Sequence, residues 1–182
     1  NDKAIKQPTN RAIADLIGLS EPSDESDLYD VVIIGVGPAG LAAAVNAAAE
    51  GLSVIAVEAN APGEQAGTSS KIENYPAFPT GISGQALGSR MMLQSQKFGT
   101  QIITPRQVKS ICCDNRPYEL VLEDDSIIRA HAVVVSSGAK WRKLGAENED
   151  RSENAGIYYG ATAVEAQMCV NEEAVIIGGG NS

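Results

Sequence analysis

Residues 29–58 read YDVVIIGVGPAGLAAAVNAAAEGLSVIAVE, and this stretch decides the fold. Residues 31–34 are a continuous run of β-branched apolar side chains, which is typical of a parallel strand buried on both faces. The alanine-rich residues 38–50 follow and stop at Gly51, which predicts a helix. Residues 53–57 predict a second buried strand. Together these elements form a strand–helix–strand unit of the size of one βαβ crossover.

The first strand and the helix are joined by Gly35-Val36-Gly37-Pro38-Ala39-Gly40, a G-x-G-x-x-G pattern in its proper context. Gly35 permits a tight turn, Gly37 lets the backbone approach a pyrophosphate, and Gly40 lets the helix pack closely on the strand. The helix N-terminus then offers free N–H groups and a partial positive charge to the phosphates. The pattern predicts a dinucleotide site.

Glu58 ends the second strand, 18 residues after Gly40. This is close to the spacing at which an acid binds ribose hydroxyls, and its carboxylate repels a 2′-phosphate. The expected ligand is therefore an adenine dinucleotide without a 2′-phosphate. The fingerprint by itself leaves FAD and NAD open.

The rest of the chain carries further local signals. Polar, glycine-rich and proline-rich residues 59–82 predict a long ordered loop, which in a compact domain is usually functional. Ser83 is expected to cap a helix that continues to Phe98, with Leu87, Met91 and Phe98 on its apolar side. The other predicted elements are a short helix over 7–19, an acidic linker over 21–27, β segments at 101–104, 108–113 and 118–122, and buried strands at 132–135 and 174–177.

Composition excludes several classes of function. The 182 residues hold 14 Lys and Arg against 23 Asp and Glu, a net charge of −9, which argues against a nucleic-acid surface. The longest apolar runs of about five residues predict no membrane span, and no signal peptide is recognisable. The three cysteines, Cys112, Cys113 and Cys169, have no metal or disulfide spacing and are expected to be buried, reduced thiols of a cytoplasmic protein.

Four segments in order resemble the thioredoxin reductase family of FAD-dependent pyridine nucleotide–disulfide oxidoreductases. They are residues 29–58, residues 65–84 with IENYPAFP at 72–79, Ser136-Ser137-Gly138-Ala139, and residues 178–182. The resemblance implies an α/β, Rossmann-like FAD/NAD(P)-binding fold: a parallel sheet with helices on both faces plus a small antiparallel β crossover, here incomplete. It also implies three parts, namely a helix and linker over 1–28 that belong to an upstream domain, an FAD-binding portion over 29–146, and a connector with the first strand of a truncated NAD(P)H-binding domain over 147–182.

The resemblance also implies roles for single residues. Gln65, Thr68 and Asn74 would line the flavin, the backbone of Val108 would bind the adenine, and Ser137 stands at the position of a family threonine. Glu64 departs from the family's Gly-Gly-Gln turn. The implied FAD-binding residues are Gly35, Gly37, Pro38, Ala39, Gly40, Glu58, Gln65, Thr68, Asn74, Val108, Ser137 and Gly138. No metal ligand is implied.

The chain departs from the family at its redox centre. Gly160 and Ala163 occupy the positions of the Cys-x-x-Cys cysteines, so the dithiol chemistry of the family has no thiols there and no catalytic residue is assigned. His131 and Trp141 are interpreted as packing or surface residues.

The leading hypothesis is a piece of an NAD(P)H-dependent flavoprotein that passes hydride to FAD and electrons to an unidentified acceptor. The alternatives are a non-catalytic flavin-binding regulatory module and, less favoured, half of an NAD-dependent dehydrogenase. The resemblance implies a homodimer. Because the second glycine cluster, 178–180, has no helix after it, the 182-residue chain is expected to bind NADPH negligibly and to retain FAD poorly or not at all. The residues past about Asn171 are expected to be held loosely or docked on another molecule.

Overall fold

A computed structural model of the chain describes residue 13 and residues 27–60, 63–139, 142–152, 155–159 and 167–178, with the backbone alone at residues 64 and 65. Apart from Ile13, which is helical and exposed, the helix expected over 7–19 lies outside the described residues. Trp141, Gly160 and Ala163 also lie outside them.

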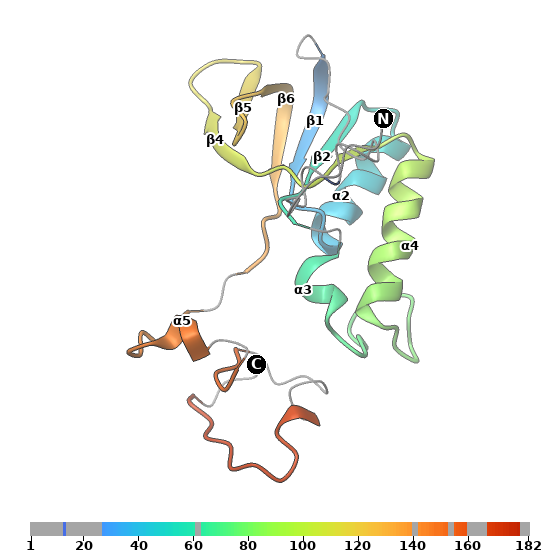
Figure 1. The fold of residues 1–182 in the computed structure, drawn as a ribbon. Coiled ribbons are helices and arrows are strands. Elements are labelled where there is room, and N and C mark those ends of the chain that lie inside the picture. Colours follow the sequence, from blue (N-terminus) through green and yellow to red (C-terminus); the bar gives the residue numbers. More distant parts are fainter. Residues whose placement is uncertain are drawn as a thin grey trace, which may run out of the picture.

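The described chain builds one six-stranded sheet with the order β3-β2-β1-β6-β5-β4 (Figure 1). The strands are β1 Leu28–Ile34, β2 Val54–Val57, β3 Gln101–Ile103, β4 Val108–Cys112, β5 Tyr118–Leu122 and β6 Ile127–Val135. Strands β3, β2, β1 and β6 are parallel, whereas β5 is antiparallel to β6 and β4 to β5. The fold is thus the predicted Rossmann-like α/β arrangement, with the antiparallel strands joined to the same sheet.

The central strand β1 is buried on both faces, as its unbroken apolar run predicts. Val32 and Ile33 both have an exposed fraction of 0% although they point to opposite faces. On the face of Ile33 lie the helices α2 (Pro38–Ala49) and α4 (Gly84–Lys97), which contribute Leu41 and Leu87 to the core. On the face of Val32 the described cover comes from β4, β5 and β6 instead of helices.

Helix α4 begins where its cap predicts. The Ser83 hydroxyl accepts a hydrogen bond from the Ala86 N–H at 3.2 Å and thereby satisfies one of the free donors of the first turn. Leu87 and Met91 are buried as expected. Phe98 is 42% exposed, so the expectation that it completes the apolar side is wrong. It follows the last helical residue, where the side-chain direction no longer obeys the helical period.

The described residues of the loop over 59–82 are ordered, as predicted, and they also include regular structure. The loop holds a one-turn helix, α3 (Glu64–Gly67), and an antiparallel bridge between Ile72 and Ile82. Two backbone hydrogen bonds between these residues, at 2.7 and 3.0 Å, close residues 72–82 into a loop with adjacent ends. Figure 1 shows α3 beside the first turns of α4, where a Cβ on Gly84 would come within 1.5 Å of the Ala66 carbonyl oxygen.

Three expectations about the chain after β3 are wrong. Residues 132–135 form the end of β6 as predicted, but they are not buried, and Val135 is 63% exposed. Residues 174–177 form no strand, and Val175 and Ile176 are 88% and 89% exposed, because among the described residues no strand lies beside them to supply hydrogen bonds. The cysteines are not buried: Cys112 and Cys113 are exposed and Cys169 is half-exposed.

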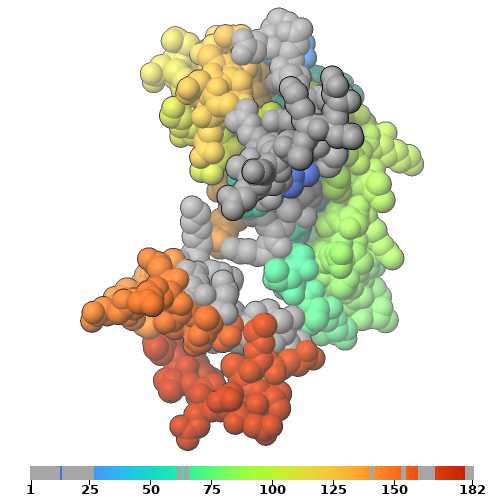
Figure 2. All heavy atoms as spheres, viewed as in Figure 1, coloured from blue at the N-terminus to red at the C-terminus, as the bar shows by residue number. Residues whose placement is uncertain are grey.

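After β6 the chain leaves the sheet and forms the short helix α5 (Glu149–Ser152). Figure 2 shows residues 142–152 and 167–178, in orange and red, gathered apart from the sheet and its helices. Within the described ranges no helix combines the length and the apolar character that crossing a bilayer requires.

Candidate functional site

The carboxyl ends of β1, β2 and β6 lie level, and the candidate site is built there. Ile34 stands beside Val57 on one side and beside Val135 on the other. The segments that follow these three strands therefore meet at one edge of the sheet, where open α/β sheets bind their ligands.

Gly35 makes the turn that leaves β1. Its φ of +95° lies in the left-handed region, which glycine adopts without the steric cost that a side chain brings. Its N–H donates to the carbonyl of Val57 at 2.8 Å. A Cβ at this position would come within 2.4 Å of the carbonyl oxygen of Ser136, so only glycine fits between β1 and the segment after β6.

Gly40 brings helix α2 against this turn. A Cβ here would come within 1.9 Å of the Gly35 carbonyl oxygen and 2.7 Å of the Ser136 Oγ. The Ser136 hydroxyl donates towards the carbonyls of Ile34 and Gly35, at 2.9 and 3.1 Å. Gly40 thus has the close-packing role that the fingerprint predicts.

Gly37 differs from Gly35 and Gly40, the other two glycines of the pattern, because it faces open space. A Cβ built on it would meet no atom within 4 Å, and its φ of −76° is one that any residue adopts. It is the N-cap of α2, no side chain caps this end, and Pro38 begins the helix. Ala39 is exposed. The N–H groups of the first turn and the positive end of the helix dipole are therefore accessible to an anion.

Glu58 is the buried charge of the site, with an exposed fraction of 1%. Its Oε2 accepts a hydrogen bond from the Val36 N–H at 2.8 Å, and its Oε1 accepts one from the Asn60 N–H at 2.9 Å. These bonds offset the cost of burying the carboxylate. An ionised carboxylate has about four acceptor positions, and these two backbone N–H groups take two of them.

The start of β4 approaches the same point. The backbone N–H of Arg106 donates to the carbonyl of Glu58 at 2.7 Å, and the Glu58 N–H donates to the carbonyl of Ile103 at 3.0 Å. Val108, half-buried at the start of β4, is two residues further along. The residue predicted to bind adenine is thus in the neighbourhood of the residue predicted to bind ribose.

Ser137 and Gly138 follow β6 and are exposed at this edge of the sheet. The Ser137 Cα lies 3.2 Å from the position that a Gly35 Cβ would take. Gly138 has a φ of +71°, so it turns the chain away from the glycine turn. The hydroxyl that bonds to the turn belongs to Ser136, whereas Ser137 is exposed.

The predicted flavin-lining segment is anchored to the glycine turn by one backbone hydrogen bond. The Gly63 N–H donates to the carbonyl of Val36 at 3.0 Å and so fixes the start of α3, which contains Gln65. Thr68 follows α3 and is exposed. Asn74 is exposed in the closed loop, and no described hydrogen bond joins it to the glycine turn. The side chain of Gln65 lies outside the description.

Sequence reasoning missed Ser136 and Arg106 as parts of the site. The Ser-Ser-Gly segment did signal a hydroxyl, but the assignment fell on Ser137 because that residue matches the family's threonine. No local pattern marks Arg106: its backbone tie to Glu58 joins residues that are distant in sequence. The roles of all twelve proposed cofactor-binding residues stay predictions.

Residues 29–182 match the family described as pyridine nucleotide-disulphide oxidoreductase. The thioredoxin reductase of Bacillus subtilis is 34% identical over 158 residues, which are 87% of this chain and 49% of the relative. A solved thioredoxin reductase from Streptococcus pyogenes is 37% identical and superposes with a TM-score of 0.60. The aligned part is 71% of this chain and 41% of the S. pyogenes chain. The thioredoxin reductase of T. acidophilum is 29% identical, with coverages of 71% and 41% and a TM-score of 0.64.

The chain thus spans about half the length of the curated relatives that it matches. The glycine turn, the strand-end acid and the open helix N-terminus lie inside the matched residues. The chain belongs to the pyridine nucleotide-disulphide oxidoreductase family.

Proposed function

We propose that the chain is the FAD-binding part of an NAD(P)H-dependent oxidoreductase of the thioredoxin reductase type. The observation that carries this proposal is the contrast within the fingerprint. The Cβ positions of Gly35 and Gly40 are blocked by backbone atoms, whereas that of Gly37 opens onto the uncapped start of α2. This arrangement leaves a space that a pyrophosphate can fill at the positive end of a helix.

The residues present fit FAD. The N–H groups at the start of α2 would hold the pyrophosphate, the Glu58 carboxylate would accept from the adenosine ribose, and the Val108 backbone would meet the adenine. The segment from α3 to Asn74 and the residues Ser137 and Gly138 would surround the flavin. When bound, the flavin supplies acceptance of a hydride and transfer of its electrons to a further acceptor.

The protein's own residues contribute binding and orientation. Glu58 fixes the glycine turn through the Val36 N–H and favours a ribose without a 2′-phosphate through its negative charge. The hydrogen bond between Gly63 and Val36 orients α3 towards the same turn. In this proposal residues 29–146 are the flavin-binding portion, and residues 147–182 lead into an NAD(P)H-binding domain of the longer parent protein.

The proposal is tested by titrating the purified chain separately with FAD and with NAD, at ligand concentrations high enough to detect the weak binding expected of this part of the protein. Binding of FAD, followed by the change in flavin fluorescence, is expected to be at least about tenfold tighter than binding of NAD, because only FAD would also contact the α3 segment. The Gly37→Ala variant, whose added methyl group enters the pyrophosphate space, is the matched control and is expected to lose FAD affinity. Equal affinity for both ligands, or an unchanged affinity of the variant, contradicts the proposal.

A second candidate is a flavin-binding regulatory module without turnover. It is favoured by Gly160 and Ala163, because two thiols are needed for disulfide exchange and neither residue carries one. The two candidates are separated by mixing the intact parent protein anaerobically with NADPH and with NADH. Loss of the flavin absorption band at about 450 nm, which shows that the flavin is reduced, supports the oxidoreductase. A flavin that stays oxidised with both nucleotides supports the module.

The electron acceptor of the oxidoreductase is expected to be something other than a disulfide handled at residues 160 and 163. Catalytic turnover of thioredoxin or of small disulfides by this chain should therefore be absent.

A homodimer is expected from the family resemblance, and sedimentation analysis of the parent tests it.

A further inference from the structure

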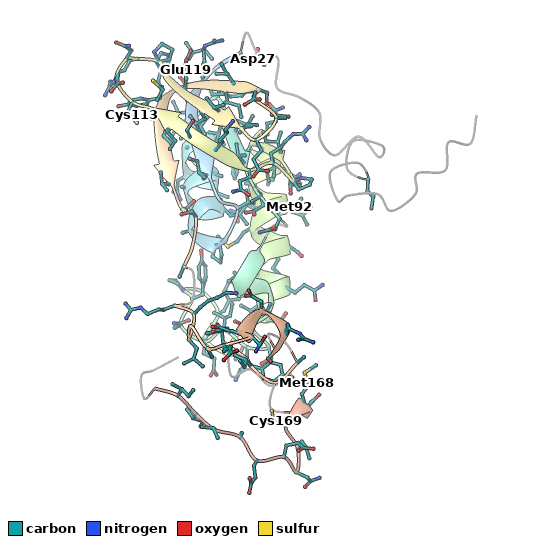
Figure 3. All side chains as sticks on the ribbon, turned by 60° about the vertical axis from the view of Figure 1, so that its left-hand side comes forward. Asp27, Met92, Cys113, Glu119, Met168 and Cys169 are labelled. Atoms are coloured by element: carbon teal, nitrogen blue, oxygen red, sulfur yellow. The ribbon has the colours of Figure 1, made fainter. Side chains whose placement is uncertain are left out.

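Two cysteines stand side by side at the outer end of the β4–β5 hairpin. Cys112 is the last residue of β4 and Cys113 is the first residue after it, and both are exposed and free. In Figure 3, Cys113 lies at the end of the sheet away from α5 and from Cys169. The pair is also at the opposite end of β4 from Val108, so it is separate from the candidate cofactor site.

The exposure of the pair follows from the strand period. Successive side chains of a strand point to opposite faces, and Ile111 packs on the core cluster between β4, β5 and the parallel strands. Cys112 therefore points to solvent. Cys113 is already in the polar turn over 113–117, where the chain no longer packs on the core. Neither thiol is needed for packing.

Adjacent cysteines are poorly placed to form a disulfide with each other. Their Cα atoms are about 3.8 Å apart across a trans peptide bond. A relaxed disulfide usually joins Cα atoms about 4.4–6.8 Å apart. A bond between Cys112 and Cys113 is therefore strained, and strained disulfides are the easily reduced ones. The pair thus differs from a Cys-x-x-Cys motif, whose second thiol readily resolves a mixed disulfide.

The charges of the hairpin are balanced. The hairpin over 108–122 holds two bases, Lys109 and Arg116, and two acids, Asp114 and Glu119, whereas the whole chain has a net charge of −9. Lys109 is paired with Asp125 at 3.0 Å, and the guanidinium of Arg116 lies 5.5 Å from the centre of the Tyr118 ring. The surroundings of the thiols therefore select neither an anionic nor a cationic reagent.

We propose that Cys112–Cys113 is a thiol-modification site that takes a small-molecule disulfide of the glutathione class and keeps one half of it as a mixed disulfide. The thiolate of either cysteine attacks one sulfur of the reagent, the reagent's S–S bond breaks, and one thiolate of the small thiol leaves. The cysteine is oxidised to the mixed disulfide and the released thiol is the reduced product. The second attack, by the neighbouring thiolate, would create the strained ring and is disfavoured. The site does not depend on bound flavin.

The proposal is tested on the full chain with glutathione disulfide, followed by intact mass and by mapping of peptides under non-reducing conditions. Wild type and Cys169→Ser are expected to gain glutathione on residue 112 or 113. The double variant Cys112→Ser/Cys113→Ser is expected to react at least about tenfold more slowly, because its remaining thiol is less accessible. Serine differs little in size from cysteine, and circular dichroism checks that each variant is folded.

Three results would overturn the proposal. One is loss of two thiols without added mass, which means that an internal disulfide forms. Another is an adduct confined to Cys169, and the third is an unchanged rate in the double variant. A C112S single variant that still carries one adduct on Cys113 supports it, since either thiol suffices for the first step.

Discussion

The backbone N–H of Val36 donates a hydrogen bond to the buried carboxylate of Glu58, with 2.8 Å between N and Oε2. This contact joins the glycine turn after β1 to the end of β2. The acid that the sequence marks as a ribose ligand is thus also a structural part of the turn that would hold the pyrophosphate. A change at Glu58 is expected to affect both the fold and the binding of the cofactor.

The first prediction is that Glu58→Gln destabilises the chain even without ligand. One carboxylate oxygen becomes an NH₂ group, which has to face one of the two backbone N–H donors now bound by Glu58. Loss of a buried hydrogen bond of this kind costs about 1–3 kcal/mol. Urea unfolding of the ligand-free chain measures it, and Glu123→Gln, an exposed acid in the β5–β6 turn, is the control.

The second prediction concerns the ligand role of the same residue. Glu58→Ala should weaken FAD binding by on the order of 1.5–3 kcal/mol, the scale of a lost charge-assisted hydrogen bond. Fluorescence titration of the flavin-free intact parent protein with FAD measures it, under conditions where unfolding curves show the variant to be folded. If FAD affinity is unchanged in the folded variant, Glu58 does not bind the ribose.

The third prediction compares two glycines of one fingerprint. Gly40→Ala places a methyl group 1.9 Å from the Gly35 carbonyl oxygen, so the helix has to move and about 3 kcal/mol or more of stability is lost. Gly37→Ala meets no atom within 4 Å and is expected to cost only about 1 kcal/mol through the weaker N-cap. Thermal unfolding of both variants decides, and similar losses would mean that Gly37 is not in open space.

The fourth prediction concerns pH. Asp30 accepts hydrogen bonds from the backbone N–H and the hydroxyl of Ser53, both at 2.8 Å. These bonds, the backbone one first, lower the pKa of Asp30 below its ordinary value of 3.8. A carboxyl group with a lowered pKa stabilises the fold above its unfolded-state pKa, and this contribution disappears as the pH falls through the lower folded-state pKa.

The stability difference between wild type and Asp30→Asn is therefore expected to be constant near neutral pH and to shrink below pH 3.8. Urea midpoints measured from about pH 2.5 to about pH 6, a range that brackets the ordinary carboxyl pKa, follow it. Asp114→Asn, in the exposed β4–β5 turn, is the matched control. A difference that grows towards low pH contradicts the assigned hydrogen bonds.

The elements with strong local signals were predictable from the sequence. The unbroken run of β1 requires a strand covered on both faces, and Ser83 starts α4 through a contact within its own first turn. The glycine pattern likewise fixed the roles of Gly35 and Gly40, since close backbone approach excludes a side chain at each. The cap at Ser83 depends on residues within one turn of each other. The run of β1 and the glycine pattern are each compatible with one local structure.

The features that were missed depend on contacts between distant residues. The backbone N–H of Arg106, between β3 and β4, donates to the carbonyl of Glu58 at the end of β2. The Ser136 hydroxyl donates to the carbonyl of Gly35, which is 101 positions earlier in the sequence. The apolar run at 174–177 has the composition of a strand, but a strand also needs a neighbour to hydrogen-bond with, and composition does not supply one. Likewise, the apolar character of cysteine suggests burial. Cys112 is exposed instead, because side chains alternate along β4 and its side chain points away from the core.

The last prediction concerns the segment after β6. Glu149 is buried, with an exposed fraction of 6%, and its carboxylate accepts hydrogen bonds from the N–H groups of Leu144, Gly145 and Ala146 at 3.3, 2.7 and 3.1 Å. The Tyr159 hydroxyl also donates to it. One side chain thus closes the segment 144–159 on itself.

Glu149→Gln replaces one of these acceptor oxygens with a donor, so the local structure is expected to open while the sheet stays folded. Hydrogen exchange should speed up by about tenfold or more at the amides of residues 144–146, since local opening governs their protection. The control is Asp150→Asn, which removes an exposed ion pair with Lys143 at 3.2 Å and is expected to change exchange little. Equal effects of the two variants, or faster exchange in β1 and β2 as well, would mean that Glu149 does not act as a local clasp.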